Sequence, residues 1–536
     1  MQTRRQFLVS LGIGTYSLMR SVSEAQAAAI FPLGRGAKAK CSRFSPIAAS
    51  SKDELLLPKG FRFDVLASYG DALGSTGPNG PELFGYDNDF LAYFPIDALK
   101  GGKQSQHGLL WVNHEFLNPL FVSGIAKSKK RSKEQLAREH SVVGGSVIEI
   151  RREKGKWARV KNSRFSKRFT ADYPEMRVTG PAASLHPKMA GTLANCSGGR
   201  TPWMTALSGE ENFQLFNPAD GLNWACVPEM AIKEENYGWI VEVDPFGELP
   251  PAKHTALGRF SHENAACRVT ADGRVAVYMG DDAVDQFLYK YVSHAKWKKT
   301  ASRAEQSALL DDGTLYAADF AKGVWIPLDL KRTPALAAAG FKSQGDVVFR
   351  AREAAKAVGA TPIDRPEDCE IHPLDGSVYV ALTNNVKHGN FFGQIIRLVE
   401  NADDAGAEKF RFEILLAGGE HSGLACPDNL VFDKKGNLFV TADISSYAIG
   451  KDPYTRYGNN GLYMVPTSGA GTGDAFQFAS GPVECELTGP WFNENEDTLF
   501  LSVQHPGEET VDLAKPTSRW PDGQTPKPSV VAITGF

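Results

Sequence analysis

From about residue 236 onward, the chain alternates short apolar runs with polar turns. Hydrophobic and polar residues take turns within each run, and Gly, Asp and Asn separate one run from the next. Alternation with a period of two residues is typical of strands that bury one face, and long helical periods are few. The pattern predicts an all-β chain of many short antiparallel strands.

One unit recurs along this region. A carboxylate stands at the start of a strand, a polar turn follows, and an apolar strand then ends in a polar or acidic residue. Because a glycine turn between two alternating runs reverses the chain, each unit predicts a hairpin. The units run from Glu263 through Asp272-Gly273, from Glu367 through Asp375-Gly376, from Asp428 through Lys435-Gly436 and, more loosely, from Pro490 through Glu496-Asp497.

Companion strands are expected at 239–245, 394–398 and 461–466. Two hairpins make a four-stranded blade, and their repeated spacing favours a six-bladed β-propeller with loop and small helical insertions. A β-sandwich is the alternative. The Ala-rich stretch 302–357 predicts a helical insertion, and we expect N-terminal strands to complete the ring by pairing with 529–534. The inner strands of a propeller converge on one axis, so polar residues at equivalent strand ends become neighbours.

The N-terminus resembles a twin-arginine signal peptide. Arg4-Arg5 precedes Phe7-Leu8, a moderately apolar stretch follows over 9–19, and Ala25-Gln26-Ala27 offers a small-residue cleavage site. We therefore expect a signal over 1–27 and export of the folded protein by the twin-arginine machinery, to the periplasm or out of the cell. That route suits a protein that acquires its metal before export. No segment holds 18 continuous apolar residues, so we expect no stable membrane insertion.

Composition narrows the choice of partners. The 536 residues are 42% hydrophobic, which is ample for a buried core, and the formal net charge is −3. No broad positive field is available to bind a phosphate backbone, so a nucleic acid is not an expected partner. The basic run over 127–133 is interpreted as a solvated surface loop. Seven dispersed cysteines form no Cys-x-x-Cys pair, and their odd number leaves at least one unpaired.

Candidate chemistry is concentrated in short polar clusters. Each cluster alone is explained by turn chemistry or surface charge, but the clusters recur at corresponding strand ends. Carboxylates gathered around one axis repel one another unless cations lie between them. Oxygen ligands suit calcium, and a thiolate among carboxylates suits iron. The clusters are Asn113-His114-Glu115, Asn195-Cys196-Ser197-Gly198-Gly199, Ser208-Gly209-Glu210-Glu211-Asn212, Ser261-His262-Glu263-Asn264, Gly280-Asp281-Asp282, Arg365-Pro366-Glu367-Asp368, Pro427-Asp428-Asn429 and Gln504-His505-Pro506.

Several of these motifs, in the same order over residues 110–510, resemble PhoX-type alkaline phosphatases. The stretch 195–203, followed by Glu210-Glu211-Asn212, is similar to the region that carries the iron-binding cysteine of that family. The other stretches that carry the resemblance are 255–263, 277–282, 365–368, 381–385, 427–430 and 504–508. The chain departs from the family pattern at Ser208-Gly209 and in short loops near His421 and Tyr447, positions that bear on substrate entry and specificity rather than on metal binding.

The resemblance implies a fold, a cofactor set and a reaction. The fold is a six-bladed propeller, here a single phosphatase domain over 28–536, and the cofactors are two Fe³⁺ ions, three Ca²⁺ ions and a bridging oxo group. The reaction is hydrolysis of phosphate monoesters outside the cytoplasm to release inorganic phosphate, by a chain that we expect to be a monomer. Carried over by motif, Cys196, Glu211 and Glu263 are iron ligands, Glu367 and Asp428 are calcium ligands, Arg365 holds the phosphate, and Glu115, Asp281, Asn429 and Asp443 are further members of the site.

Structural explanations compete with these roles. Without the resemblance, Arg365 is interpreted as the partner of Glu367 or Asp368 in a salt bridge, and Cys196 is interpreted as a buried thiol. Two other functions stay open: a non-catalytic, calcium-stabilised binding propeller, and a calcium-dependent, lactonase-like propeller hydrolase. Neither needs iron or Cys196. A helical zinc-protease motif, a Gly-x-Ser-x-Gly elbow and a nucleotide-binding loop are all missing from the sequence.

Overall fold

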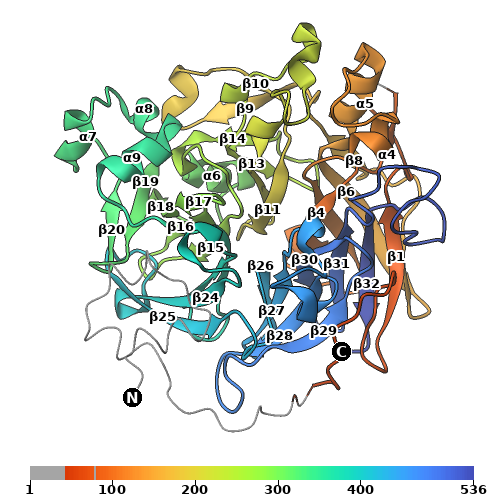
Figure 1. Ribbon diagram of the computed structural model, residues 1–536. Helices are drawn as coiled ribbons and strands as arrows, with labels where there is room; N and C mark the ends of the chain where they lie inside the picture. Colours follow the sequence, from red (N-terminus) through yellow and green to blue (C-terminus); the bar gives the residue numbers. More distant parts are fainter. Residues whose placement is uncertain (1–40, 42, 78–79) are drawn as a thin grey trace.

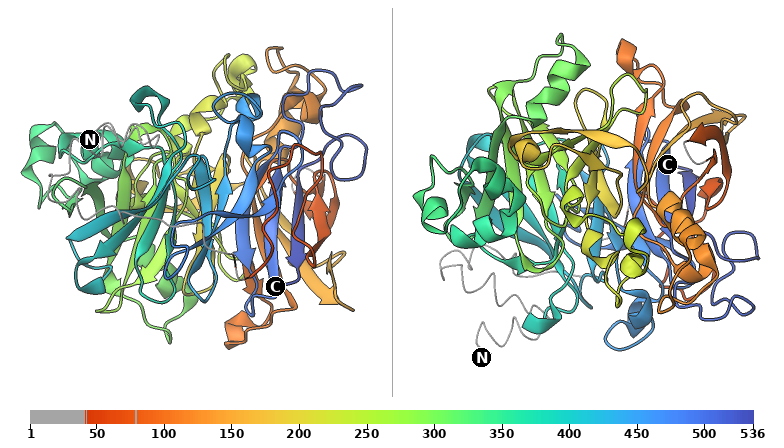
Figure 2. Two further views of the ribbon diagram at one scale, coloured as in Figure 1. Left: turned by 60° about the horizontal axis from the view of Figure 1, so that its bottom comes forward. Right: turned by 90° about the horizontal axis from the view of Figure 1, so that it is seen from above.

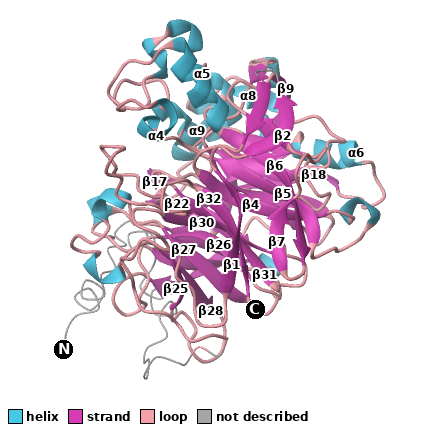
Figure 3. Ribbon diagram, turned by 90° about the vertical axis from the view of Figure 1, so that its right-hand side faces the viewer, coloured by secondary structure: helices cyan, strands magenta, loops and turns pink. Residues whose placement is uncertain are grey.

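The computed structural model describes residue 41 and residues 43–77 and 80–536. Strands are the main regular structure of the described chain, and the helices between them are short (Figures 1 and 3). The expected signal peptide over 1–27 lies outside the described residues. Within those residues, no helix is long and apolar enough to cross a membrane.

Six larger sheets follow one another along the described chain, with mainly antiparallel pairing. The first sheet holds β4 (Asn88–Pro95), β5 (His107–His114), β6 (Gly144–Glu153), β7 (Lys156–Arg159) and β8 (Lys167–Phe169). The second holds β9 (Glu175–Thr179), β10 (Met189–Ala190), β11 (Asn195–Arg200), β12 (Ala206–Glu210), β13 (Ile240–Val243) and β14 (Ala252–His254). The third holds β15 (Ala266–Val269), β16 (Arg274–Gly280), β18 (Leu288–Lys296), β19 (Gly313–Asp319) and β20 (Val324–Pro327).

The remaining three larger sheets have four strands each, and two small sheets lie beside them. The fourth holds β22 (Pro366–Ile371), β23 (Val378–Leu382), β24 (Gln394–Glu400) and β25 (Phe410–Ala417). The fifth holds β26 (Pro427–Phe432), β27 (Asn437–Ala442), β28 (Gly461–Pro466) and β29 (Phe476–Ser480). The sixth holds β30 (Glu486–Phe492), β31 (Thr498–Gln504), β32 (Ser529–Thr534) and β1 (Arg62–Ser68), and the small sheets pair β2 (Ala72–Gly77) with β3 (Gly80–Leu83) and β17 (Val284–Gln286) with β21 (Ile363–Asp364).

The sheets pack face to face in sequence order, and the sixth packs on the first. A buried apolar cluster fills each of the six interfaces. Strand β16 shows how the alternation serves this packing, because Val275 and Val277 enter the cluster shared with the second sheet while Ala276 and Tyr278 enter the cluster shared with the fourth. Both faces of a sheet are thus buried, which differs from a two-sheet sandwich.

One edge strand of each larger sheet lies innermost. β4 contacts β11, β11 contacts β15, and the series continues through β22, β26 and β30 back to β4. The labels of β4, β11, β15, β26 and β30 surround the centre of the molecule in Figure 1. The chain ends meet in one sheet, since β1 pairs antiparallel with β32, Arg62 opposite Thr534. Figure 2 shows these red and blue segments side by side. The prediction that N-terminal strands pair with 529–534 is confirmed.

The sequence signals of turns and insertions are also found in the structure. The turn glycines Gly273, Gly376 and Gly436 have φ between 71° and 92°, a conformation that side chains with a Cβ rarely adopt. The stretch 302–357 holds four short α-helices, which confirms the helical insertion. The α-helices of the described chain are α4 (Pro119–Ser123), α5 (Lys133–Val142), α6 (Arg303–Ser307), α7 (Pro334–Ala338), α8 (Gln344–Phe349) and α9 (Ala351–Ala357).

Candidate metal centre

Equivalent positions at the start of the innermost strands supply the acidic site. Asp89, Cys196, Glu367 and Asp428 are each the second residue of β4, β11, β22 and β26. Each of them lies within a short interval in which the pairing with the next strand shifts register. A bulge of this kind bends a strand and re-aims its side chains. Residues that lie far apart in the sequence are therefore directed toward one region at the axis.

The side chains meet in three overlapping groups. One ligand atom from each of Asp89, Glu115 and Cys196 lies within 4.8 Å of the others, and the same holds for Cys196, Glu211 and Glu263. The third group joins Glu263 to Glu367 and Asp428. The sulfur of Cys196 lies 3.3 Å from Oδ2 of Asp89 and 3.1 Å from Oε2 of Glu263. Six of the seven sequence-predicted metal ligands are thus brought together, with Cys196 and Glu263 shared between groups.

Electrostatics favour a cation in these groups. Burial, followed by repulsion from neighbouring carboxylates, raises the pKa of Glu211, Glu263, Glu367 and Asp428 well above the ordinary values. The carboxyl of Asp89 behaves in the same way, and its buried Oδ1 has no hydrogen-bond partner in the described part of the chain. A buried carboxylate oxygen without a partner is costly. Oxygen donors together with one thiol fit calcium and iron, so the residues present suit the implied cofactors.

Arg365 lies at the edge of the acidic site. Its Nε and Nη2 donate to the two carboxylate oxygens of Asp282 at 2.9 and 2.7 Å, and Nη2 also lies 2.8 Å from Oε1 of Glu367. Its Nη1 lies 3.5 Å from Asp443. The backbone of Arg365 has φ 47°, a strained conformation for a residue with a side chain. The salt bridge with Glu367 that sequence reasoning weighed against phosphate binding therefore exists, and it sets Arg365 directly beside the metal-ligating candidates.

Polar side chains fix the carboxylates in place. Nε2 of Gln504 donates to Glu115 at 2.9 Å, and Oγ1 of Thr383 donates to Oε1 of Glu367 at 2.8 Å. Asn429 stands between two of the groups, since its Nδ2 lies 3.3 Å from Oε1 of Glu263 and 3.1 Å from the neighbouring Asp428. These bonds hold oxygen atoms whose mutual repulsion would otherwise separate them.

Asp281 does not join the groups. Its buried carboxylate is held by the guanidinium of Arg352, with Nε 3.1 and 2.9 Å from the two oxygens, and it also accepts from the backbone N–H of Ser261 at 3.2 Å. The next residue, Asp282, takes the position at the acidic site through Arg365. These contacts therefore do not support the expected role of Asp281 as a metal ligand, because its oxygens already pair with the guanidinium of Arg352.

Sequence reasoning missed three acidic residues near the site: Asp89, Asp282 and Glu486. Asp282 stood within a recognised motif, but strand β16 ends at Gly280, and alternation does not say which of the two following carboxylates faces the axis. Glu486 begins β30 and lies 3.3 Å from Nε2 of His505. The signal for Asp89 was the polar run 87–89 before an apolar strand, the same layout as at Asp428.

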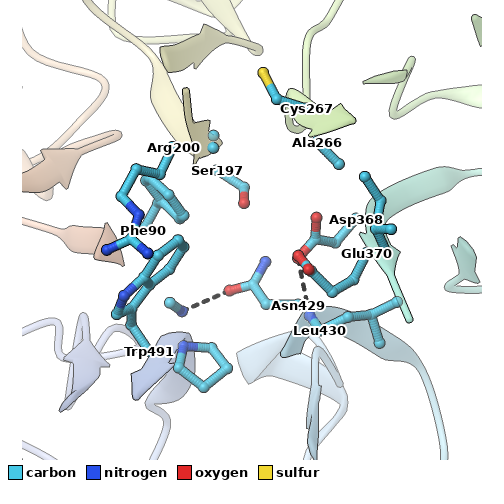
Figure 4. Close-up of a pocket in the computed structure, with 15 residues that line it drawn as sticks. Phe90, Ser197, Arg200, Ala266, Cys267, Asp368, Glu370, Asn429, Leu430 and Trp491 are labelled. Carbon is cyan, nitrogen blue, oxygen red and sulfur yellow. Dashed lines mark hydrogen bonds between the residues drawn. The ribbon is translucent and has the colours of Figure 1, made fainter. Parts of the chain in front are cut away.

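A cavity of about 270 Å³ continues along the inner strands beyond the acidic site. Figure 4 shows side chains from several sheets pointing into it, with Asp368 and Glu370 on one side and Arg200, stacked over Trp491, on the other. Asp368 accepts from the backbone N–H of Leu430 at 2.9 Å. The inner strands thus line a space along the axis, in addition to carrying ligand candidates at their second residues.

Comparison with known proteins places the chain near characterised phosphatases. The family model described as alkaline phosphatase PhoX matches residues 42–507. No curated protein matches the chain. Among solved structures, Pseudomonas fluorescens PhoX in complex with vanadate, a transition state analogue, is 33% identical, and the match covers 92% of this chain and 97% of that one with a TM-score of 0.80. A gluconolactonase from Xanthomonas campestris is 11% identical over 92% of this chain and 99% of its own, with a TM-score of 0.34.

Proposed function

Since this chain belongs to the PhoX alkaline phosphatase family and is a metal-dependent phosphatase, we propose that it hydrolyses phosphate monoesters outside the cytoplasm and releases inorganic phosphate. The observation that carries the proposal is the chain of three overlapping ligand groups that share Cys196 and Glu263. A binding propeller has no use for a thiol among buried carboxylates, and a lactonase-like enzyme with one axial cation does not need three groups. The vanadate bound to the Pseudomonas fluorescens protein adds support for phosphoryl chemistry.

We propose two Fe³⁺ ions, three Ca²⁺ ions and a bridging oxo group as cofactors. Cys196, Glu211 and Glu263 would hold iron, with Asp89 and Glu115 beside them, and the Glu263, Glu367 and Asp428 group would hold calcium. When bound, these ions supply the positive charge that stabilises a phosphoryl group in its transition state and acidify water. Asp281 is left out of the ligand set because Arg352 already pairs with it.

The chain itself binds and orients the substrate. Arg365 offers a planar fork that stays charged at alkaline pH and can donate to two phosphate oxygens at once. Its present partners, Asp282 and Glu367, hold that fork in one orientation at the edge of the ligand groups. An arriving phosphate exchanges one carboxylate contact of the guanidinium for its own oxygens. The amide of Asn429 and the hydroxyl of Thr383 keep the carboxylates in position during that exchange.

We also propose a single six-bladed propeller domain over 28–536, a twin-arginine signal over 1–27 and a monomeric protein. The cyclic contacts of the six innermost strands and the six interfaces between larger sheets support the blade number. The pairing of β1 with β32 supports closure of the ring by the two chain ends. Export in the folded state is consistent with ligands drawn from several sheets, since the site exists only once the ring has formed.

The test uses the mature protein reconstituted with iron and calcium. We expect turnover of an aromatic phosphate monoester at alkaline pH and about two iron ions per chain. Cys196→Ser and Arg365→Ala should lose most of this activity, whereas Cys369→Ser, which changes a thiol buried between two sheets, should keep it. Wild-type protein with its full metal content and no turnover would reject the proposal, as would full activity in Cys196→Ser.

A further inference from the structure

A second ligand group lies outside the acidic site, on the small sheet formed by β17 and β21. One ligand atom from each of Asp285, Asp364 and His388 lies within 4.8 Å of the others. Nε2 of His388 is 3.5 Å from Oδ1 of Asp285, and Nδ1 of His388 is 3.6 Å from Oδ1 of Asp364. No residue of this group belongs to the three groups at the inner strands. The cluster therefore needs its own explanation.

The amide of Asn385 supplies an independent sign of a ligand. This residue is fully buried, and its Nδ2 donates to Asp285 at 3.0 Å and to Asp364 at 2.9 Å. Its Oδ1 is buried and has no hydrogen-bond partner in the described part of the chain. Leaving such an oxygen without a partner costs about 1–3 kcal/mol. In this orientation the amide nitrogen faces the two carboxylates. A half-turn of the amide would place the oxygen there instead, and a cation bound between the carboxylates would then give that oxygen a partner.

The local fold holds this group together. The loop after β23 returns on itself, because Asn385 and Asn390 exchange backbone hydrogen bonds at 2.7 and 3.0 Å. The side chain of Asn390 also donates to Oδ2 of Asp364 at 3.1 Å. His388 therefore reaches the two carboxylates from a closed loop rather than from a free one.

The mixture of donors selects the ion. Calcium takes oxygen ligands, while zinc accepts an imidazole nitrogen together with carboxylate oxygens. We propose that Asp285, Asp364 and His388, together with the oxygen of Asn385 after a half-turn of its amide, bind a divalent ion of the zinc class. The side chain of His388 is 28% exposed and that of Asp285 is 37% exposed, so the ion can enter from solvent.

The position of this site connects it to the phosphate-binding arginine. Asp364 directly precedes Arg365, and Asp285 follows Asp282 by three residues. The two strands of the small sheet thus carry the arginine and its carboxylate partner at their ends. An ion bound by Asp285 and Asp364 ties these strands together and fixes the Arg365–Asp282 pair. The binding site itself does not depend on the phosphatase assignment.

Anomalous diffraction tests the site directly. Crystals of the mature protein already loaded with iron and calcium are soaked in Zn²⁺, and data are collected on both sides of the zinc absorption edge. We expect a zinc peak between Asp285, Asp364 and His388 in the wild type and in His294→Ala, a control that removes an exposed histidine paired with Asp312. The peak should be absent in His388→Ala. A wild type without this peak, or a His388→Ala crystal that keeps it, overturns the proposal.

A solution measurement covers variants that do not crystallise. Titration calorimetry of the same loaded protein with Zn²⁺ should show one site whose affinity falls at least tenfold in Asp285→Asn, which keeps the shape of the side chain, and in His388→Ala. Circular dichroism verifies that both variants are folded. Unchanged zinc affinity in both variants, or binding of Ca²⁺ but not Zn²⁺, rejects the site. A loaded wild-type protein that binds Zn²⁺ but has no phosphatase activity would count against the proposed function alone.

Discussion

Two neighbouring glutamates show how differently this protein treats buried charge. Glu210 and Glu211 are both buried at the end of β12. Glu210 faces Lys253, whose Nζ lies 2.7 Å from Oε1, and the same solution recurs in another sheet, where Lys290 lies 2.9 Å from Glu400. Glu211 turns toward Cys196 and Glu263 instead.

The difference lies in where the compensating cation comes from. Lysine side chains of the chain itself pair with Glu210 and Glu400 inside the packed sheets. Glu211 and Glu263 form no ion pair with a lysine or arginine anywhere in the described chain, and burial with mutual repulsion raises the pKa of both well above the ordinary value. Buried charges left this way are unfavourable without an ion. The buried carboxylates at the axis therefore need bound metal ions to compensate their charge. The buried glutamates Glu210 and Glu400 within the sheets are instead compensated by lysines of the chain.

Glu263→Gln should have the largest effect on activity. Glu263 belongs to two of the three ligand groups, so its loss removes several kcal/mol of charge stabilisation, or about a thousandfold in kcat. Metal analysis should show a lower iron and calcium content. The metal-free variant should unfold at a higher temperature than metal-free wild type, because one of several repelling groups is gone. Full metal content with normal turnover would contradict the assigned ligand role.

Lys253→Met should damage the other region instead. Removing the lysine leaves Glu210 buried without its cation, which costs about 3 kcal/mol of unfolding free energy. The measurement is urea denaturation of the metal-loaded protein. Iron and calcium content per folded chain should remain at the wild-type level, because Lys253 touches no residue of the ligand groups. A loss of metal without a loss of stability would mean that the two regions are not separate.

Arg365→Lys tests an arginine that pairs with Asp282 and also lies beside the metal-ligand candidate Glu367. A lysine keeps the charge but loses the planar fork, so we expect kcat/KM for an aromatic phosphate monoester to fall about tenfold. The matched control is Arg352→Lys, which changes the same kind of two-oxygen pair at the adjacent carboxylate, Asp281. Its kcat/KM should stay within about twofold of wild type. Equal losses in both variants would indicate a structural role for Arg365.

How much of this could be predicted from sequence depends on the regularity of the repeat. From Glu263 onward each sheet starts with the same layout, so the repeat alone is enough to place Glu367 and Asp428 at the axis. Asp89 could not be placed in this way, because insertions with their own helices separate the strands of the first sheet and hide the repeat. The ambiguity between Asp281 and Asp282 has a different cause, since both follow the end of a strand and only the position of Arg352 decides it.

The pH dependence of the metal-free protein gives the smallest but most direct contrast. Burial, then the charge of Asp443, raises the pKa of Glu486 to about 8, and burial raises that of Asp87 to about 7. For a raised pKa, the contribution to stability is fully present below the ordinary value and is lost as pH rises through the folded value. Glu242 is the opposite case: burial would raise its pKa, but hydrogen bonds led by that of His254 hold it at about 2, so its contribution is lost only in acid.

Chelated protein should therefore lose thermal stability between about pH 5 and pH 8, while metal-loaded protein should not. Scanning calorimetry across that range measures the difference, and Glu486→Gln should reduce the slope of the curve of the chelated protein because one of the titrating groups is gone. A chelated wild type whose melting temperature is constant from pH 5 to pH 8 would show that the axial carboxylates are neutralised by the chain itself. The contrast between axis and sheets would then fail, because residues of the chain would neutralise the buried carboxylates in both regions.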